Sequence, residues 1–237
     1  MSKKWKFSLV LIFVAAQLAL LISVLTCGGD IIPPLQFSAI ALAFAFSLIF
    51  ISFRDRDFIV QFALLFTVIS DIFLVLVQPR NQGVAMTTFS LTQILYFILL
   101  LMETPSKRIR LANLISRIFL IIAVQVVTLV VIKDKADYVA LISMFYFTNI
   151  VLNAVFALFN FKKNPLLAIG ILFFLFCDIF IGLNCAVGVY INVPENSFLY
   201  KMAFPSFNWA WLFYIPSQTL IAISCAYKPF KTNKDNL

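Results

Sequence analysis

Two aspartates, Asp71 and Asp178, lie deep within long apolar segments, and they are the residues best suited to carry chemistry. The chain holds ten acidic residues, and the other eight fall in hydrophilic breaks between apolar segments. A charged side chain at the centre of a bilayer costs about 3 kcal/mol or more, so acids placed there usually mark functional sites. We therefore take both aspartates as candidate functional residues.

A pair of buried carboxyl groups has a defined chemical use. Two such groups brought close in a poorly hydrated site cannot both ionise cheaply, so the pair is expected to share one proton. It then supplies a general acid and a general base together. Proton-coupled transport uses residues of the same kind, and a structural role, in which each aspartate only bonds a neighbouring helix, is a third interpretation.

The two aspartates stand in matching sequence contexts, which predicts an internal duplication. The segment from Phe66 to Leu76 reads like the segment from Phe173 to Leu183, and each contains Asp-Ile-Phe. Asp71 and Asp178 are 107 positions apart, and Gln17 and Gln125 are 108 apart. Gln93 and Gln218 are 125 apart, the excess being taken up by the long loop near Val193 to Phe207. We predict one transmembrane domain over 1–237, with repeat 1 over about 1–107 and repeat 2 over about 108–237.

The elements that position these residues follow from the composition. The chain is 63% hydrophobic and 12% charged, with a mean hydropathy of +1.03, which a water-soluble globule of 26.9 kDa could not bury. Apolar runs of roughly 18 to 25 residues suit helices that cross ~30 Å of hydrocarbon. Eight are found, at about 7–26, 35–53, 58–77, 83–102, 111–132, 138–160, 165–189 and 208–227. The predicted fold is an all-α polytopic membrane protein with eight transmembrane helices.

The basic residues give an orientation. The net charge of +8 would suggest nucleic acid in a soluble protein, but here the lysines and arginines flank the spans, and no nucleic-acid partner is expected. One side has four: Arg80, Lys133, Lys135 and Lys201. The other has Lys3, Lys4, Lys6, Arg54, Arg56, Lys107, Arg108, Arg110, Lys162, Lys163, Lys228, Lys231 and Lys234, with Arg117 near it. The positive-inside rule therefore predicts that both termini are cytoplasmic.

Polar side chains within the spans are expected to surround the acids. Because each repeat has an even number of spans, the repeats run in parallel, and both aspartates lie at similar depth, ~20 Å from the cytoplasmic face. Gln93 lies three residues before Tyr96, and Gln218 four residues after Tyr214, so each pair shares a helical face. These four residues are predicted to join the aspartates in a common polar centre.

Several other chemistries are excluded or disfavoured by the residue types. With no histidine, a Ser-His-Asp or Cys-His site and an imidazole-based metal or haem site are impossible. The four cysteines form no CxxC pair, and no GxxxxGK[ST] phosphate loop occurs. We expect no metal and no cofactor.

Four segments resemble motifs of the YhhN family of eight-span membrane proteins, which includes the lysoplasmalogenases. The family patterns are an apolar run into Gly-Asp, then Phe-x-x-x-His-x-x-Tyr, Gly-x-x-x-Phe-x-x-Ser-Asp and Tyr-x-x-Ala-Gln-x-Leu-Ile. The similar segments here are Phe66 to Leu76, Phe89 to Tyr96, Gly170 to Asp178 and Tyr214 to Ile221. Two departures are notable, because Ser70 stands at the first glycine position and Gln93 at the histidine position.

The resemblance implies an integral membrane hydrolase that cleaves the vinyl ether bond of a lysoplasmalogen, a lysophospholipid that reaches the site from the bilayer. In that interpretation Asp71 and Asp178 are the acid and base of catalysis, as paired carboxylates are in glycoside hydrolysis. Gln93, Tyr96, Tyr214 and Gln218 would orient water and substrate. The alternative function is a proton-coupled small-solute transporter that uses the same intramembrane aspartates.

Overall fold

The computed structural model describes residues 2–51, 58–187 and 189–227, and this part of the chain is helical almost throughout. Arg54, Arg56, Lys228, Lys231 and Lys234, on which the predicted orientation partly depends, lie outside the described residues. The helices are α1 (Lys3–Thr26), α2 (Ile32–Leu48), α3 (Phe58–Asp71), α4 (Gln82–Glu103), α5 (Lys107–Ile132), α6 (Tyr138–Phe159), α7 (Pro165–Ala186), α8 (Phe198–Ala203) and α9 (Trp209–Ser224). The all-α polytopic class is confirmed.

Seven helical segments of the described chain are long and apolar enough to cross a membrane. They correspond to the first seven of the eight predicted spans. The eighth prediction, 208–227, coincides with α9, which has 16 residues and an internal proline, Pro216. At 1.5 Å per residue α9 is ~24 Å long, shorter than the hydrocarbon core that a full span crosses.

Polar residues at the ends of the apolar runs define where several helices begin. Asn81, Ser106, Asp137 and Asn164 each accept a hydrogen bond from the backbone N–H three residues ahead. Such caps satisfy backbone donors at the helix N-terminus that no carbonyl reaches. Within the helices the backbone bonds itself, which a chain in hydrocarbon requires.

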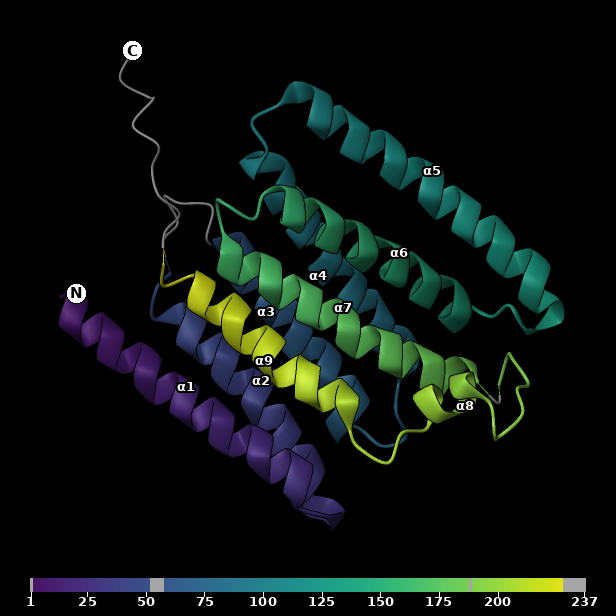
Figure 1. Ribbon diagram of the computed structural model, residues 1–237, viewed down its shortest axis with the longest axis horizontal. Coiled ribbons are helices and arrows are strands. Elements are labelled where there is room, and N and C mark those ends of the chain that lie inside the picture. Colours follow the sequence, from purple (N-terminus) through teal and green to yellow (C-terminus); the bar gives the residue numbers. More distant parts are fainter. Residues whose placement is uncertain (1, 52–57, 188, 228–237) are drawn as a thin grey trace.

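The short helix α9 lies between α1 and α7 in the nearer layer of helices (Figure 1). It packs most extensively against α7 and also contacts α1, α2 and α3. On the other side of the bundle, α4 packs between α3 and α6, whereas α5 lies at the edge and packs chiefly on α6. The central elements α3, α4, α6, α7 and α9 therefore carry the interior in which a site can be built.

The α7–α9 contact depends on a glycine. A Cβ atom built on Gly170 would lie 2.7 Å from Cγ1 of Ile221 and 3.2 Å from the Ser217 carbonyl oxygen. With no side chain at Gly170, the Ser217 hydroxyl reaches the Gly170 carbonyl at 2.8 Å. Small residues allow helices to approach in this way inside membranes.

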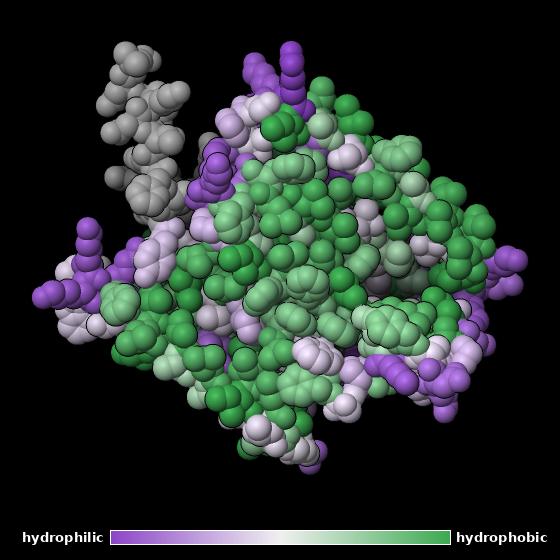
Figure 2. All heavy atoms as spheres, in the orientation of Figure 1, coloured by the Kyte–Doolittle hydropathy of each residue, from purple (hydrophilic) through white to green (hydrophobic). Residues whose placement is uncertain are grey.

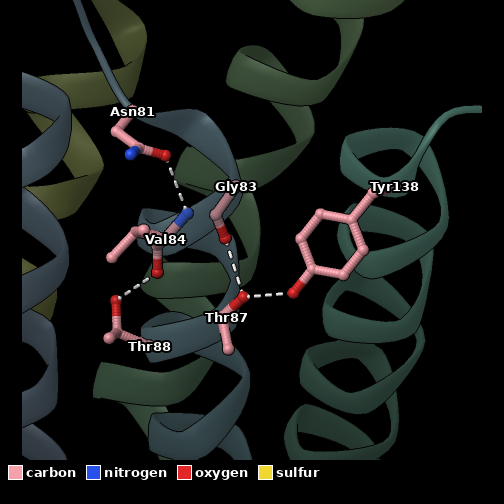
Figure 3. Close-up of a pocket in the computed structure, with 6 residues that line it drawn as sticks. All are labelled: Asn81, Gly83, Val84, Thr87, Thr88 and Tyr138. Atoms are coloured by element: carbon pink, nitrogen blue, oxygen red, sulfur yellow. Dashed lines mark hydrogen bonds between the residues drawn. The ribbon is translucent and has the colours of Figure 1, made fainter.

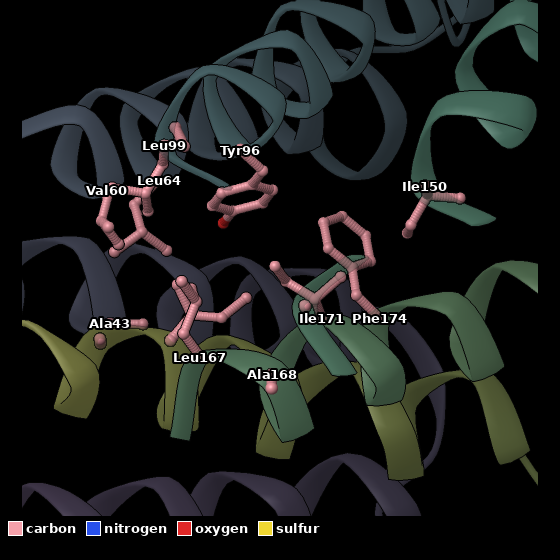
Figure 4. Packing of buried hydrophobic residues seen from close by; sticks show 14 of the residues in the cluster. Ala43, Val60, Leu64, Tyr96, Leu99, Ile150, Leu167, Ala168, Ile171 and Phe174 are labelled. Atoms are coloured by element: carbon pink, nitrogen blue, oxygen red, sulfur yellow. The ribbon is translucent and has the colours of Figure 1, made fainter. Parts of the chain in front are cut away.

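The interior and the surface are both apolar, as expected for a protein in lipid. Figure 4 shows part of the core, where Tyr96 reaches from α4 toward Leu167 and Ile171 of α7. Figure 2 shows one face covered mainly by hydrophobic residues, with hydrophilic residues gathered at its margins. The edge helix α5 is the extreme case, because large side chains such as Phe119 and Val130 are more than half exposed.

Candidate functional site

The two predicted acids lie inside the bundle, on α3 and α7. Asp71 is 2% exposed and Asp178 is 9% exposed. Asp71 is the last residue of α3, and a π-helical turn, Ile72–Leu76, continues the segment. Turns of this kind occur often at functional sites in helices. Asp178 lies within the regular helix α7, thirteen residues after Pro165.

Each aspartate accepts a hydrogen bond from a tyrosine on a different helix. The Tyr214 hydroxyl, from α9, donates to Oδ2 of Asp71 at 2.7 Å. The Tyr146 hydroxyl, from α6, donates to Oδ2 of Asp178 in a short hydrogen bond. Four helices thus bring two acid–phenol pairs together.

The ring of Phe174 joins the two pairs into one site. Its centroid lies 5.4 Å from the Tyr214 ring and 6.5 Å from the Tyr146 ring. Phe89 of α4 adds a fourth ring, 5.6 Å from Tyr146 and 5.9 Å from Phe174. Phe174 is also one helical turn before Asp178, so it shares a face of α7 with the acid it shields. The carboxyl groups therefore lie beside aromatic walls rather than bulk water.

Of the four residues predicted to orient water and substrate, one forms a hydrogen bond with an aspartate. Tyr214 contacts Asp71 directly, whereas Gln93, Tyr96 and Gln218 are buried in the bundle interior with no hydrogen bond to either aspartate. Three of their polar atoms, Nε2 of Gln93, the Tyr96 hydroxyl and Oε1 of Gln218, have no partner within the described part of the chain. Unsatisfied polar atoms at such depth call for water or a ligand.

Tyr146 is a site residue that the sequence interpretation missed. It lies in an apolar, phenylalanine-rich run, where a tyrosine is easily taken as packing surface. A usable signal was present, because Tyr146 starts a polar stripe with Asn149 and Asn153 at spacings of three and seven. Such a stripe predicts that this face of α6 points to the interior.

Arg117 is predicted to lie near the cytoplasmic face, and the structure places its side chain inside the bundle. The residue is 4% exposed, and its guanidinium lies 4.0 Å from the centroid of the Phe97 ring. It donates to Oδ1 of Asn149 in a short hydrogen bond and to Oδ1 of Asn153 at 2.8 Å. No carboxylate among the residues described forms an ion pair with it. An intramembrane arginine is costly and is itself a functional candidate.

The Arg117 network fixes the orientation of Gln93. Because a guanidinium only donates, the Asn153 oxygen must face it, and the Asn153 amide nitrogen must point away. That nitrogen donates to the Gln93 backbone oxygen at 2.8 Å and to Oε1 of Gln93 at 2.9 Å. Gln93 is therefore held with Nε2, a hydrogen-bond donor, left without a hydrogen-bond partner in the described chain.

A surface pocket of about 340 Å³ lies at the beginnings of α4 and α6 (Figure 3). Its lining includes Thr87, whose hydroxyl is 2.6 Å from that of Tyr138, and Thr88. The Thr88 hydroxyl is in turn 2.6 Å from that of Ser70, the residue before Asp71. The contact between the Thr88 and Ser70 hydroxyls therefore links the pocket wall to the residue before the buried acid.

The geometry defines a class of protein: a polytopic α-helical membrane protein with a buried acidic site between its spans. Among the described residues, no group of three or more cysteines and acids is placed to hold a metal ion. The sequence model of the YhhN family matches residues 32–225, which include both aspartates and both tyrosines that bind them. The chain belongs to the YhhN family, and the resemblance drawn from its motifs is confirmed. No curated protein and no solved structure matches it significantly.

Proposed function

We propose that this protein is an integral membrane hydrolase that cleaves the vinyl ether bond of lysoplasmalogens by acid–base catalysis with Asp71 and Asp178. The observation that carries the proposal is the pair of buried carboxyl groups, each bound by a tyrosine hydroxyl and both set around Phe174. Membership of a family that includes lysoplasmalogenases supports the same reaction.

In the first step, one aspartate is protonated and the other is a carboxylate. The acid gives its proton to the alkene carbon that is remote from the ether oxygen, so a C–H bond forms from the alkene electron pair. The neighbouring carbon becomes an oxocarbenium ion, which the charged carboxylate stabilises. That carboxylate then takes a proton from water while the water oxygen bonds to the cationic carbon.

The product of this step is a hemiacetal, and its collapse restores the enzyme. The first aspartate accepts the hemiacetal hydroxyl proton, the second protonates the leaving oxygen, and the C–O bond to the glycerol unit breaks. A fatty aldehyde and a glycerophospho-headgroup compound leave, with one water consumed and no oxidation or reduction. Each residue returns to its starting state, so the cycle requires no cofactor.

The surrounding side chains have separate roles in this proposal. Tyr146 and Tyr214 hold one oxygen of each carboxyl group and leave the other oxygen for proton transfer. Gln93 offers a donor, Gln218 an acceptor and Tyr96 a hydroxyl, which suits them to position water and substrate. A single acyl chain would lie against the aromatic walls, which exclude bulk water from the cation.

We infer further that the bundle has eight spans in two parallel repeats, with both termini cytoplasmic. Equivalent bonds support the duplication: Thr92 donates to the Ala63 carbonyl, and Ser217 donates to the Gly170 carbonyl, at the sequence offsets of the repeat. Lys6, near the start of α1, lies 4.8 Å from the ring of Tyr227, just beyond α9. Two ends on one face require an even number of crossings.

The topology is tested with epitope tags at the two termini in sealed, right-side-out membrane vesicles. Both tags should resist protease until the vesicles are permeabilised. Digestion of one tag only would place the termini on opposite sides and overturn the eight-span arrangement.

The reaction is tested with purified protein and a 1-alkenyl lysophospholipid, by measuring aldehyde release. Asp71→Asn and Asp178→Asn should each lower the rate by about 10²- to 10⁴-fold, the contribution typical of a general acid or base. The matched substrate control is the saturated alkyl ether, which has no alkene to protonate and should stay intact. Inactive wild-type protein that is folded would refute the hydrolase.

A proton-coupled carrier is the second candidate, because buried acids with hydroxyl partners also suit proton relays. The contact between the hydroxyl of Thr88, in the wall of the Figure 3 pocket, and that of Ser70, the residue before Asp71, is the observation that favours it over a purely structural role for the aspartates. Proteoliposomes loaded with a pH-sensitive dye discriminate between carrier and hydrolase. Solute-dependent proton uptake that Asp71→Asn abolishes, without aldehyde release, would favour the carrier.

A further inference from the structure

We propose that the groove between the end of α4 and the beginning of α5 binds an anionic phospholipid, independently of the acidic site. The groove has a volume of about 450 Å³ and is lined by Leu101, Met102, Lys107, Arg110, Leu111 and Leu114. Two cations and four apolar side chains thus share one surface. This combination matches a lipid, whose phosphate carries the charge and whose chains are hydrocarbon.

The groove exists because α5 leaves α4 soon after the turn that joins them. Thr104 and Ser106 belong to this turn; Thr104 bonds back to α4 and Ser106 caps α5. Beyond the turn α5 packs chiefly on α6 rather than on α4 (Figure 1). The face of α5 that looks toward α4 is therefore left without a helix to cover it.

The residues along this face are ordered as a lipid requires. Lys107, Arg110, Leu114 and Arg117 follow at spacings of three, four and three, which places them on one side of α5. The two exposed cations come first, and the apolar side chains follow. Arg117, three residues beyond Leu114, stacks on Phe97 of α4. Between Arg110 and Arg117 the helix rises ~10 Å, which gives room for a glycerol unit and the upper part of an acyl chain.

Charge complementarity selects an anionic lipid over a zwitterionic one. Lys107, Arg108 and Arg110 begin α5, against one acid, Glu103, in the turn before it. The start of α1, with Lys3, Lys4 and Lys6, lies at the same end of the bundle (Figure 1). Basic pockets between spans at such an interface are suited to lipid phosphates.

The test titrates detergent-purified full-length protein with phosphatidylglycerol and, separately, with phosphatidylcholine of the same chain length, and follows the first bound lipid by native mass spectrometry. The wild type should prefer phosphatidylglycerol. Each basic residue near the headgroup contributes about fivefold, so the double variant Lys107→Gln/Arg110→Gln should weaken phosphatidylglycerol binding by about 30-fold. Binding of phosphatidylcholine should change little.

The matched control is Lys3→Gln/Lys4→Gln, which removes the same charge from the same end of the bundle but outside the groove. It should bind phosphatidylglycerol as the wild type does. Leu114→Trp fills the groove without a change in charge and should also weaken phosphatidylglycerol binding, which keeps the test decisive if the double variant misfolds. Equal losses in the control, equal wild-type affinity for both lipids, or unchanged binding in the groove variants would each overturn the proposal.

Discussion

Removal of one hydroxyl, in Tyr214→Phe, tests the central feature of the proposed site. The Tyr214 ring is 4% exposed and packs against Phe174 and Trp211, at centroid distances of 5.4 and 5.2 Å. Phenylalanine keeps these ring contacts and loses only the 2.7 Å hydrogen bond to Asp71. The variant therefore separates the acid–phenol bond from the packing around it.

The expected loss follows from the kind of hydrogen bond removed. A hydrogen bond to a charged group contributes about 1.5–3 kcal/mol. If the phenol supports the carboxylate that forms when Asp71 gives up its proton, the whole of that energy acts on the transition state. At 1.36 kcal/mol for each factor of ten, kcat should fall by about 10- to 150-fold, with KM unchanged. Tyr146→Phe should give a loss of similar size through Asp178.

The assay is steady-state aldehyde release from a 1-alkenyl lysophospholipid in a defined micelle. Size-exclusion chromatography and thermal unfolding measure the folded fraction of each variant. Tyr200→Phe is the matched control, since Tyr200 lies on α8, away from both aspartates. A kcat for Tyr214→Phe within twofold of the wild type, in folded protein, would refute the catalytic role of the acid–phenol pair. So would an equal loss in Tyr200→Phe.

Three further predictions concern the framework of the site. Gly170→Val should lower the melting temperature and the activity together, because the added Cβ meets Ile221 at 2.7 Å and overpacking of a tight contact typically costs about 1–3 kcal/mol. Gly170→Ala should lower both by less, and thermal unfolding in detergent compares the two variants. Gln93→His should retain activity in the aldehyde assay. A neutral imidazole, like the Gln93 amide, can accept a hydrogen bond from Asn153 with one atom and present a donor with another. An inactive, folded variant would contradict this equivalence. Arg117→Leu should lower kcat by about tenfold while the protein stays folded, because the hydrogen bond that the oriented Gln93 amide donates contributes about 1–1.5 kcal/mol. An unchanged kcat in folded protein would rule out an orienting role for Arg117.

The sequence predicted the spans well because hydrocarbon restricts what a backbone can do. A long apolar run in lipid has to satisfy its own amide groups, so run length alone predicts a helix. The same reasoning located Asp71 and Asp178, since an acid in such a run has no solvent to face. Both are buried inside the bundle, and Tyr214 donates a hydrogen bond to Asp71.

The sequence did not predict which faces of the helices pack against one another. Helices that are apolar on all sides carry little amphipathic signal, so their rotation is set by packing rather than by pattern. Tyr146 therefore could not be assigned to Asp178 from spacing alone, although it lies on the same stripe as Asn149 and Asn153. The burial of the Arg117 side chain was not predicted for a related reason, because distance along the chain from a membrane face does not show whether a long side chain turns inward or toward solvent.

The proposed duplication supplies an internal comparison for Arg117. Gln17 and Gln125, 108 positions apart, each donate to a backbone carbonyl of the following helix, at 2.8 and 3.0 Å. At the same offset Arg117 corresponds to Leu9, which packs against the hydrophobic core. A helix pair of this design therefore forms without a buried cation. Since the cation is costly and the first copy omits it, packing is a poor reason for Arg117. The better reason is its effect on the second copy, where it fixes Asn153 and so holds Gln93 with Nε2 left without a hydrogen-bond partner in the described chain.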